Sequence, residues 1–374
     1  LVHPDKKINF EAKIHFLVNP MNKENFPLLT KTTYLNTAYV GLISTQLAEF
    51  RRSNEEFYLF NGGDKYKIKA YDELFSLHEN FACFFGLTPN RCFGISNFSS
   101  GIRTALSFFP RKMKVLFVEE DYPSLTNAFL EQDFECITIP MQPNLEKAIE
   151  RKLKETTVDI LAISMVQYTS GLLIDQEFLK KIRTHYPELV IIGDATQFLG
   201  AHEFQFDESP FDLVAGSGYK WILAGFGNGI LMLSEALIKK FELSTELMRE
   251  RFFQGHFNIL GLTSLNFAIQ QLQEHNFKEL IQKKEALSQT AKNELSDLGF
   301  LPQWVAERKK HSSIFSLKGG DALAEFFQKK NIRAVVRGTG VRVSFHFYNS
   351  EQDLEKLTIA LKEFKGLNGH LSFD

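Results

Sequence analysis

Cysteine is scarce in this 374-residue chain. The three cysteines, Cys83, Cys92 and Cys136, show no metal-ligand spacing, and an odd number cannot all pair with one another. So sparse a set is typical of a reducing compartment, and we expect a cytoplasmic protein. The ten histidines are scattered and no HExxH motif occurs, so the sequence predicts no metal site.

An excess of charge of one sign is also lacking, because 43 basic residues stand against 45 acidic ones. This balance gives no electrostatic reason to expect nucleic acid or an anionic membrane surface as a partner. No apolar run approaches the roughly 18 residues of a membrane span, and the first twenty residues lack the apolar block of a signal peptide. Apolar residues make up 44% of the chain, with 37 phenylalanines, which predicts a large core.

Apolar runs of strand length alternate with amphipathic segments in the middle of the chain. The runs lie at 115–118, 136–139, 160–166, 189–192, 213–215 and 230–233. This alternation predicts βαβ units, and therefore an α/β fold with a mainly parallel sheet. Before it, residues 1–30 read as an irregular arm, and residues 44–85 as two helices separated by a loop at 61–63.

The pattern changes after residue 257. Helices are expected at 263–274, 277–298 and 352–364, and short strands at 313–317, 332–336 and 341–345. Helices and hairpin-like strands together predict a smaller α+β lobe. We therefore expect a large α/β domain at 31–255 and a small domain that combines 1–30 with 256–374.

Two charged groups follow neighbouring predicted strands. Asp194 ends the apolar run 189–192, and Lys220 lies in a Gly/Ser turn after the run 213–215. An acid and an amine at adjacent strand ends suit a pyridinium-aldehyde cofactor, since the amine binds the aldehyde and the acid keeps the ring nitrogen protonated. Taken singly, Asp194 can instead cap a turn and Lys220 can be a surface residue.

Several hydroxyl groups near these positions are candidate phosphate ligands. Ser99 and Ser100 precede an expected helix at 102–109, where free N–H groups and the helix dipole favour an anion. Ser217 and Tyr219 flank the lysine turn and can add two donors. Taken alone, Ser99 and Ser100 are better explained as an ordinary serine N-cap.

Other side chains are suited to contacts with a planar ring or a substrate. Tyr122, before Pro123, can lie flat on a ring, or it can form a hydrophobic staple beside a helix. Gln167 and Gln197 can bond a phenolic oxygen, or they can satisfy backbone groups of loops. Arg342 interrupts an apolar strand and matches a carboxylate, unless it lies on an exposed edge. The glycines at 216 and 218 do not complete a dinucleotide fingerprint, because Trp221 stands at the third glycine's place.

In order along the chain, these motifs resemble class V aminotransferases and their cysteine-desulfurase-like relatives, which are pyridoxal 5'-phosphate enzymes of fold type I. The resemblance implies a seven-stranded sheet, an amino-acid substrate and a homodimer with shared active sites. The segment 252–258 resembles the one that reaches the partner's phosphate. The implied cofactor-binding residues are Ser99, Ser100, Tyr122, Gln167, Asp194, Gln197, Ser217, Tyr219, Lys220 and His256, and the implied substrate-binding residues are Asn36, Ala38 and Arg342.

The chain departs from the family pattern at two points. The desulfurase branch uses a cysteine on a mobile loop late in the chain, whereas no cysteine follows Cys136. We therefore do not expect sulfur transfer by that persulfide route. His256 stands where a small hydroxyl residue is common in the family.

The implied activity is that of an aminotransferase, in which Lys220 moves the α-proton, Asp194 keeps the ring nitrogen charged and Arg342 holds the substrate carboxylate. Epimerisation or racemisation, and β- or γ-elimination, are alternatives with the same cofactor. A non-catalytic binding or regulatory protein with this fold is an alternative from another class.

Overall fold

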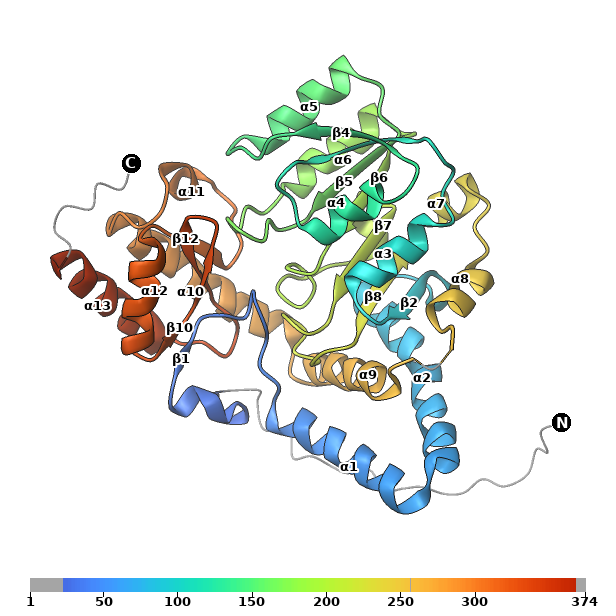
Figure 1. Cartoon of the computed structure of the whole chain (residues 1–374), viewed down its shortest axis with the longest axis horizontal. Helices are drawn as coiled ribbons and strands as arrows, with labels where there is room; N and C mark the ends of the chain where they lie inside the picture. Colours follow the sequence, from blue (N-terminus) through green and yellow to red (C-terminus); the bar gives the residue numbers. More distant parts are fainter. Residues whose placement is uncertain (1–22, 256, 368–374) are drawn as a thin grey trace.

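A computed structural model describes residues 23–255 and 257–367 (Figure 1). Its main feature is a seven-stranded sheet with the order β2-β8-β7-β6-β5-β3-β4. The strands are β2 (Cys92–Ile95), β3 (Lys114–Val118), β4 (Glu135–Ile139), β5 (Ile160–Ser164), β6 (Val190–Asp194), β7 (Leu213–Ser217) and β8 (Gly229–Leu233). Strands β4, β3, β5, β6 and β7 are parallel, while β8 is antiparallel to both of its neighbours. The predicted α/β fold with a mainly parallel sheet is confirmed.

Helices cover both faces of this sheet, so its central strands are buried throughout. One face packs on α3 (Phe98–Leu106), α4 (Pro123–Leu130), α7 (Glu235–Lys240) and α8 (Thr245–Phe252). The other packs on α2 (Gly63–Phe85), α5 (Leu145–Glu155), α6 (Gln176–His185) and α9 (Ile259–Glu274). Along β3 the side chains point alternately into the cores on the two faces, because successive residues of a strand face opposite sides of the sheet.

The predicted helix pair before the sheet is present as α1 (Thr45–Asn61) and α2. Gly62 separates the two helices with a φ of +84°, a conformation that favours glycine. Residues 23–30 of the expected arm form two short turns, and residues 1–22 lie outside the described part. The 3₁₀ helices are η1 (Lys23–Asn25), η2 (Pro27–Thr30), η3 (Pro89–Arg91) and η4 (Phe206–Glu208).

The C-terminal part contains two small sheets over a core of its own. Its helices are α10 (Phe277–Asp297), α11 (Gln303–Glu307), α12 (Gly320–Lys329) and α13 (Glu351–Leu367). Three antiparallel strands have the order β11-β12-β9, with β9 (Ile314–Leu317), β11 (Val335–Arg337) and β12 (Gly340–Ser344). Strand β1 (Thr33–Tyr34) pairs in parallel with β10 (Ile332–Arg333), which brings the N-terminal segment to the C-terminal part (Figure 1).

The expectation of one strand at 332–336 is wrong. The run divides at Ala334 into β10 and β11, which belong to different sheets. The short strand β2 lies outside the predicted runs. The division into domains at 31–255 and at 1–30 with 256–374 stays a prediction. No described helix has the length and apolar character needed to cross a membrane.

Candidate active site

Three neighbouring strands of the large sheet end in polar residues at the same edge. Ser164 ends β5, Asp194 ends β6 and Ser217 ends β7, and Ser164 pairs with Asp194 in the β5–β6 register. Lys220 follows three residues after β7. Because these strands are parallel, their ends carry the acid and the amine to one edge, as the sequence predicts.

Asp194 is a buried carboxyl group with 4% of its surface exposed. Its Oδ1 accepts a hydrogen bond from the Thr196 N–H at 2.8 Å. Burial raises its pKa to about 6, the negative charge of Asp121 acts in the same direction, and the positive charge of Lys220 opposes them. A carboxylate in this environment is stabilised by a cationic partner such as a protonated ring nitrogen.

Lys220 is equally buried, and it makes no hydrogen bond or ion pair with any other described residue. Its Nζ lies 5.6 Å from the centre of the Tyr122 ring and 5.5 Å from that of Tyr219. Burial lowers its pKa to about 7, as does the positive charge of Arg342, while Asp194 opposes them. A large share of this amine is therefore neutral, and nucleophilic, at neutral pH.

Tyr122 is held at the site by a carboxyl group that the sequence analysis did not single out. Asp121 accepts from the Tyr122 N–H at 2.7 Å, the Ser164 hydroxyl at 2.5 Å and the Ser164 N–H at 2.9 Å. It also accepts from Gln167 Nε2 at 3.2 Å, whereas Gln167 Oε1 is buried without a partner. Asp121 therefore orients both Tyr122 and Gln167. Its burial raises its own pKa.

The candidate phosphate ligands gather at the start of α3. The Ser217 hydroxyl accepts from the Phe98 N–H at 2.9 Å, and the Ser99 hydroxyl bonds that of Ser124 at 2.6 Å. Asn97 caps the helix by accepting from the Ser100 N–H at 2.9 Å. Hydroxyl groups at the N-terminus of a nine-residue helix suit a phosphate.

Gln197 connects two segments of the site. Its Nε2 donates to the Ala38 carbonyl at 2.8 Å, and its Oε1 accepts from the Trp221 indole at 2.7 Å. Both ends of this buried amide are thus occupied by protein groups. Its predicted bond to a phenolic oxygen stays a prediction, and its observed contacts are those of a positioning residue.

The substrate-carboxylate candidate, Arg342, lies on the central strand of the small sheet and is 2% exposed. Its Nη1 donates to the Tyr168 carbonyl at 2.5 Å, but its Nε is buried without a partner. No described carboxylate forms an ion pair with it, and burial and the charge of Arg337 lower its pKa to about 10. A buried guanidinium left in this state is suited to an incoming carboxylate.

The N-terminal segment meets β12 beside this arginine. Asn36 forms a parallel bridge with Ser344, whose hydroxyl accepts from the Ala38 N–H at 3.0 Å. The Asn36 Oδ1 atom is buried and unpaired. The structure therefore brings Asn36 and Ala38 to the strand that carries Arg342, three hundred residues away in sequence.

Two predicted cofactor-binding positions remain, Tyr219 and His256. Tyr219 stacks on Phe226 with ring centres 5.2 Å apart, and burial raises its pKa to about 12. His256 lies outside the described residues. Within the part of the chain that is described, no cluster of three His, Cys, Asp or Glu residues could hold a metal ion.

Pyridoxal phosphate fits this set of groups. The unpaired atoms Gln167 Oε1, Asn36 Oδ1 and Arg342 Nε, together with the unbonded Lys220 amine, leave acceptors and donors at the edge between the two sheets. Asp194 can hold a ring nitrogen, Lys220 an aldehyde carbon, and the start of α3 a phosphate.

Comparisons with known proteins show the family and the fold of the chain. The family Aminotransferase class-V matches residues 131–357, more than half of the chain. A probable cysteine desulfurase of Ureaplasma parvum serovar 3 (strain ATCC 700970) is 22% identical over 236 residues, which cover 54% of this chain and 58% of that protein. The match therefore spans less than two thirds of that relative.

Solved structures resemble the whole fold. The apo cysteine desulfurase of Thermococcus onnurineus NA1 has a TM-score of 0.76 at 19% identity and covers 92% of this chain and 97% of its own. The complex of the cystine C–S lyase C-DES with its product cysteine persulfide has a TM-score of 0.76 at 15% identity, with coverage of 90% and 98%. At these identities the likeness shows the fold.

Proposed function

The chain belongs to the aminotransferase class-V family, whose members depend on pyridoxal phosphate, and we propose that it uses this cofactor to cleave the C–S bond of a cysteine-derived amino acid. The observation that carries the use of the cofactor is the buried, unbonded Lys220 amine, positioned where the charges of Asp194 and Arg342 act on it. We write the reaction below with cystine as the substrate.

The comparisons favour C–S cleavage over amino transfer, and the positions of the cysteines favour elimination over transfer of sulfur to a protein cysteine. The relatives at hand are a probable cysteine desulfurase, a cysteine desulfurase and a cystine C–S lyase. In addition, the three cysteines lie away from the site, with Cys83 on α2 and Cys92 and Cys136 on the two edge strands of the large sheet. Elimination from cystine needs no protein cysteine, because the sulfur leaves with the other half of the substrate.

When bound, the cofactor withdraws electrons from the substrate α-carbon. Arg342 holds the α-carboxylate, which fixes the α-carbon relative to Lys220. The Lys220 amine accepts the α-proton, a double bond forms between the α- and β-carbons, and the β-carbon–sulfur bond breaks with its electron pair on sulfur. With hydrolysis of the resulting enamine, cystine and water give pyruvate, ammonia and cysteine persulfide.

The test incubates the cofactor-loaded protein with cystine, S-alkyl cysteines and a panel of ordinary amino acids. Pyruvate and ammonia in equal amounts from cystine, both lost in Lys220→Ala, would support the proposal. A keto acid that retains the donor's side chain, formed together with pyridoxamine phosphate, would replace it with transamination. Borohydride reduction that leaves Lys220 unlabelled would remove the cofactor assignment and favour a non-catalytic protein.

A further inference from the structure

The hairpin between β11 and β12 places a second arginine beside the carboxylate-binding candidate. Arg337 is paired with Gly340 across a turn of two residues, and Arg342 follows two positions along β12. Cross-strand partners and residues two apart lie on the same face of a sheet. Arg337 and Arg342 therefore share one face as diagonal neighbours, roughly 7–8 Å apart at this register.

The two faces of this small sheet have opposite character. Val341, Val343 and Leu317 point into the C-terminal core, whereas Arg337, Arg342 and the serines at 316 and 344 take the other face by the same alternation. Gly340 lies opposite Arg337, and the Ser316 hydroxyl occupies the space that a side chain at position 340 would need. Both arginines are thus directed by the strand register toward the side on which Ala38 and Tyr168 lie, since the Ser344 hydroxyl on that face accepts from the Ala38 N–H.

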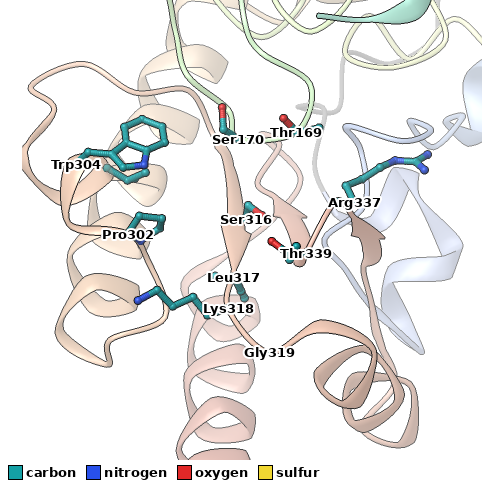
Figure 2. A pocket seen from close by; sticks show the side chains of 13 residues that line it. Thr169, Ser170, Pro302, Trp304, Ser316, Leu317, Lys318, Gly319, Arg337 and Thr339 are labelled. Atoms are coloured by element: carbon teal, nitrogen blue, oxygen red, sulfur yellow. The ribbon is translucent and has the colours of Figure 1, made fainter. Parts of the chain in front are cut away.

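Arg337 is half-buried and has no carboxylate partner among the described residues. Its guanidinium lies 5.1 Å from the centre of the Tyr39 ring, in the same N-terminal segment as Ala38. Figure 2 shows its side chain extending away from Pro302 and Trp304. Its charge acts on the site, since it lowers the pKa of both Arg342 and Lys220.

A cavity of about 620 Å³ adjoins this arginine and is large enough for a small-molecule ligand. It is lined by the hairpin 337–340, by Thr169 and Ser170, and by Pro302, Trp304 and Val305; Figure 2 shows Pro302 and Trp304 on the side opposite to Arg337. Thr169 and Ser170 directly follow Tyr168, whose carbonyl holds Arg342. Arg337 therefore lines the cavity, whereas Arg342 lies behind the segment that contains Thr169 and Ser170 and is not one of its lining residues.

We propose that Arg337 binds a second carboxylate of the substrate while Arg342 binds the α-carboxylate. The site then selects dicarboxylic amino acids whose second carboxylate is on the group that leaves with the sulfur. Cystine is the simplest such compound. Two guanidinium groups without carboxylate partners repel each other when they share one face of a sheet. An anion bound to each guanidinium group reduces that repulsion. The assignment of Arg342 to the α-carboxylate rests on the proposed function.

The test measures binding without turnover. The ligands are 3,3'-dithiodipropionate, which is cystine without its amino groups, and 3-(propyldithio)propionate, which lacks one carboxylate. Neither can react with the cofactor, so a protein that fails to cleave cystine still gives a result. Isothermal titration of the cofactor-loaded protein should show the dicarboxylate bound about tenfold more tightly or better, as expected for a charge-assisted bond.

Variants at position 337 test how much the second arginine contributes to the preference for the dicarboxylate. Arg337→Gln should bring the ratio of the two affinities close to one, and Arg337→Lys should keep part of the ratio. Arg333→Gln, at the exposed residue of β10 in the other small sheet, is the matched control and should keep the full ratio. A ratio near one in the unmodified protein, no binding of the dicarboxylate to it, or an unchanged ratio in a folded Arg337→Gln protein would overturn the inference.

Discussion

The amine of Lys220 should react with an aldehyde at a pH at which ordinary lysines are inert. Its pKa of about 7 leaves roughly half of the amine neutral at pH 7, whereas a lysine near 10.4 is neutral in fewer than about one molecule in a thousand. The difference corresponds to about a thousandfold higher concentration of the nucleophile. The cause is burial first and the Arg342 charge second.

The assay follows labelling of Lys220 in the cofactor-free protein. Pyridoxal phosphate is added between pH 5.5 and 9.5, borohydride stops the reaction at set times, and mass spectrometry quantifies the labelled peptide. The rate should reach half of its plateau near pH 7, because only the neutral amine reacts. Exposed Lys65 in the same digest reports how pH affects the reagents themselves.

Two variants give the sign of each electrostatic contribution. Arg342→Gln removes a positive charge that disfavours protonation of Lys220, so the midpoint should rise. Asp194→Asn removes a negative charge that favours protonation, so the midpoint should fall. A rate that keeps rising through pH 9 without a plateau, or midpoints that move in the opposite directions, would refute the reasoning.

Three further perturbations test the surroundings of the site. Gln197→Leu should lower the free energy of unfolding by about 2–4 kcal/mol in denaturant titrations, because it leaves the Trp221 indole and a buried carbonyl unpaired; a loss no larger than in exposed Gln303→Leu would contradict this. Asp121→Asn should lower the pKa of Asp194 below about 6 by removing a negative charge, and an unmoved midpoint in a carboxyl ¹³C NMR titration would exclude it. Ser217→Ala should weaken binding of pyridoxal phosphate about tenfold by fluorescence titration, whereas Ser107→Ala at the far end of α3 should not; equal affinities would remove Ser217 from the phosphate site.

The large sheet was predictable because its central strands are buried on both faces. Continuous apolar runs of strand length, such as those of β5 and β6, are typical of such strands, and here the polar residue that ends each run lies at the carboxyl edge. The division of 332–336 was not predictable. Nothing local distinguishes Ile332 from Val335, and the strand β10 exists because β1, about three hundred residues earlier, pairs with it.

The same distinction holds at the site. Asp194, Lys220 and Arg342 are charged residues inside apolar or Gly/Ser segments, which makes them conspicuous in the sequence. Asp121 follows two other acids, and the sequence does not tell which of the three is buried. The position of Arg337 depends on the register of a two-residue hairpin, because a shift by one residue would turn its side chain to the other face.

The charges around Lys220 indicate which ligand groups the site would stabilise. Arg342 and Arg337 are cations without acidic partners among the described residues, and the two nearby carboxyl groups, Asp121 and Asp194, both have raised pKa values because they are buried. The protein as a whole carries a formal net charge of −2, so this concentration of positive charge is local. Buried charges of one sign are costly unless a ligand pairs with them. A phosphate at the start of α3 and two carboxylates at the hairpin would supply that pairing, which is why we expect affinity to depend on the number of anionic groups in the substrate more than on its size.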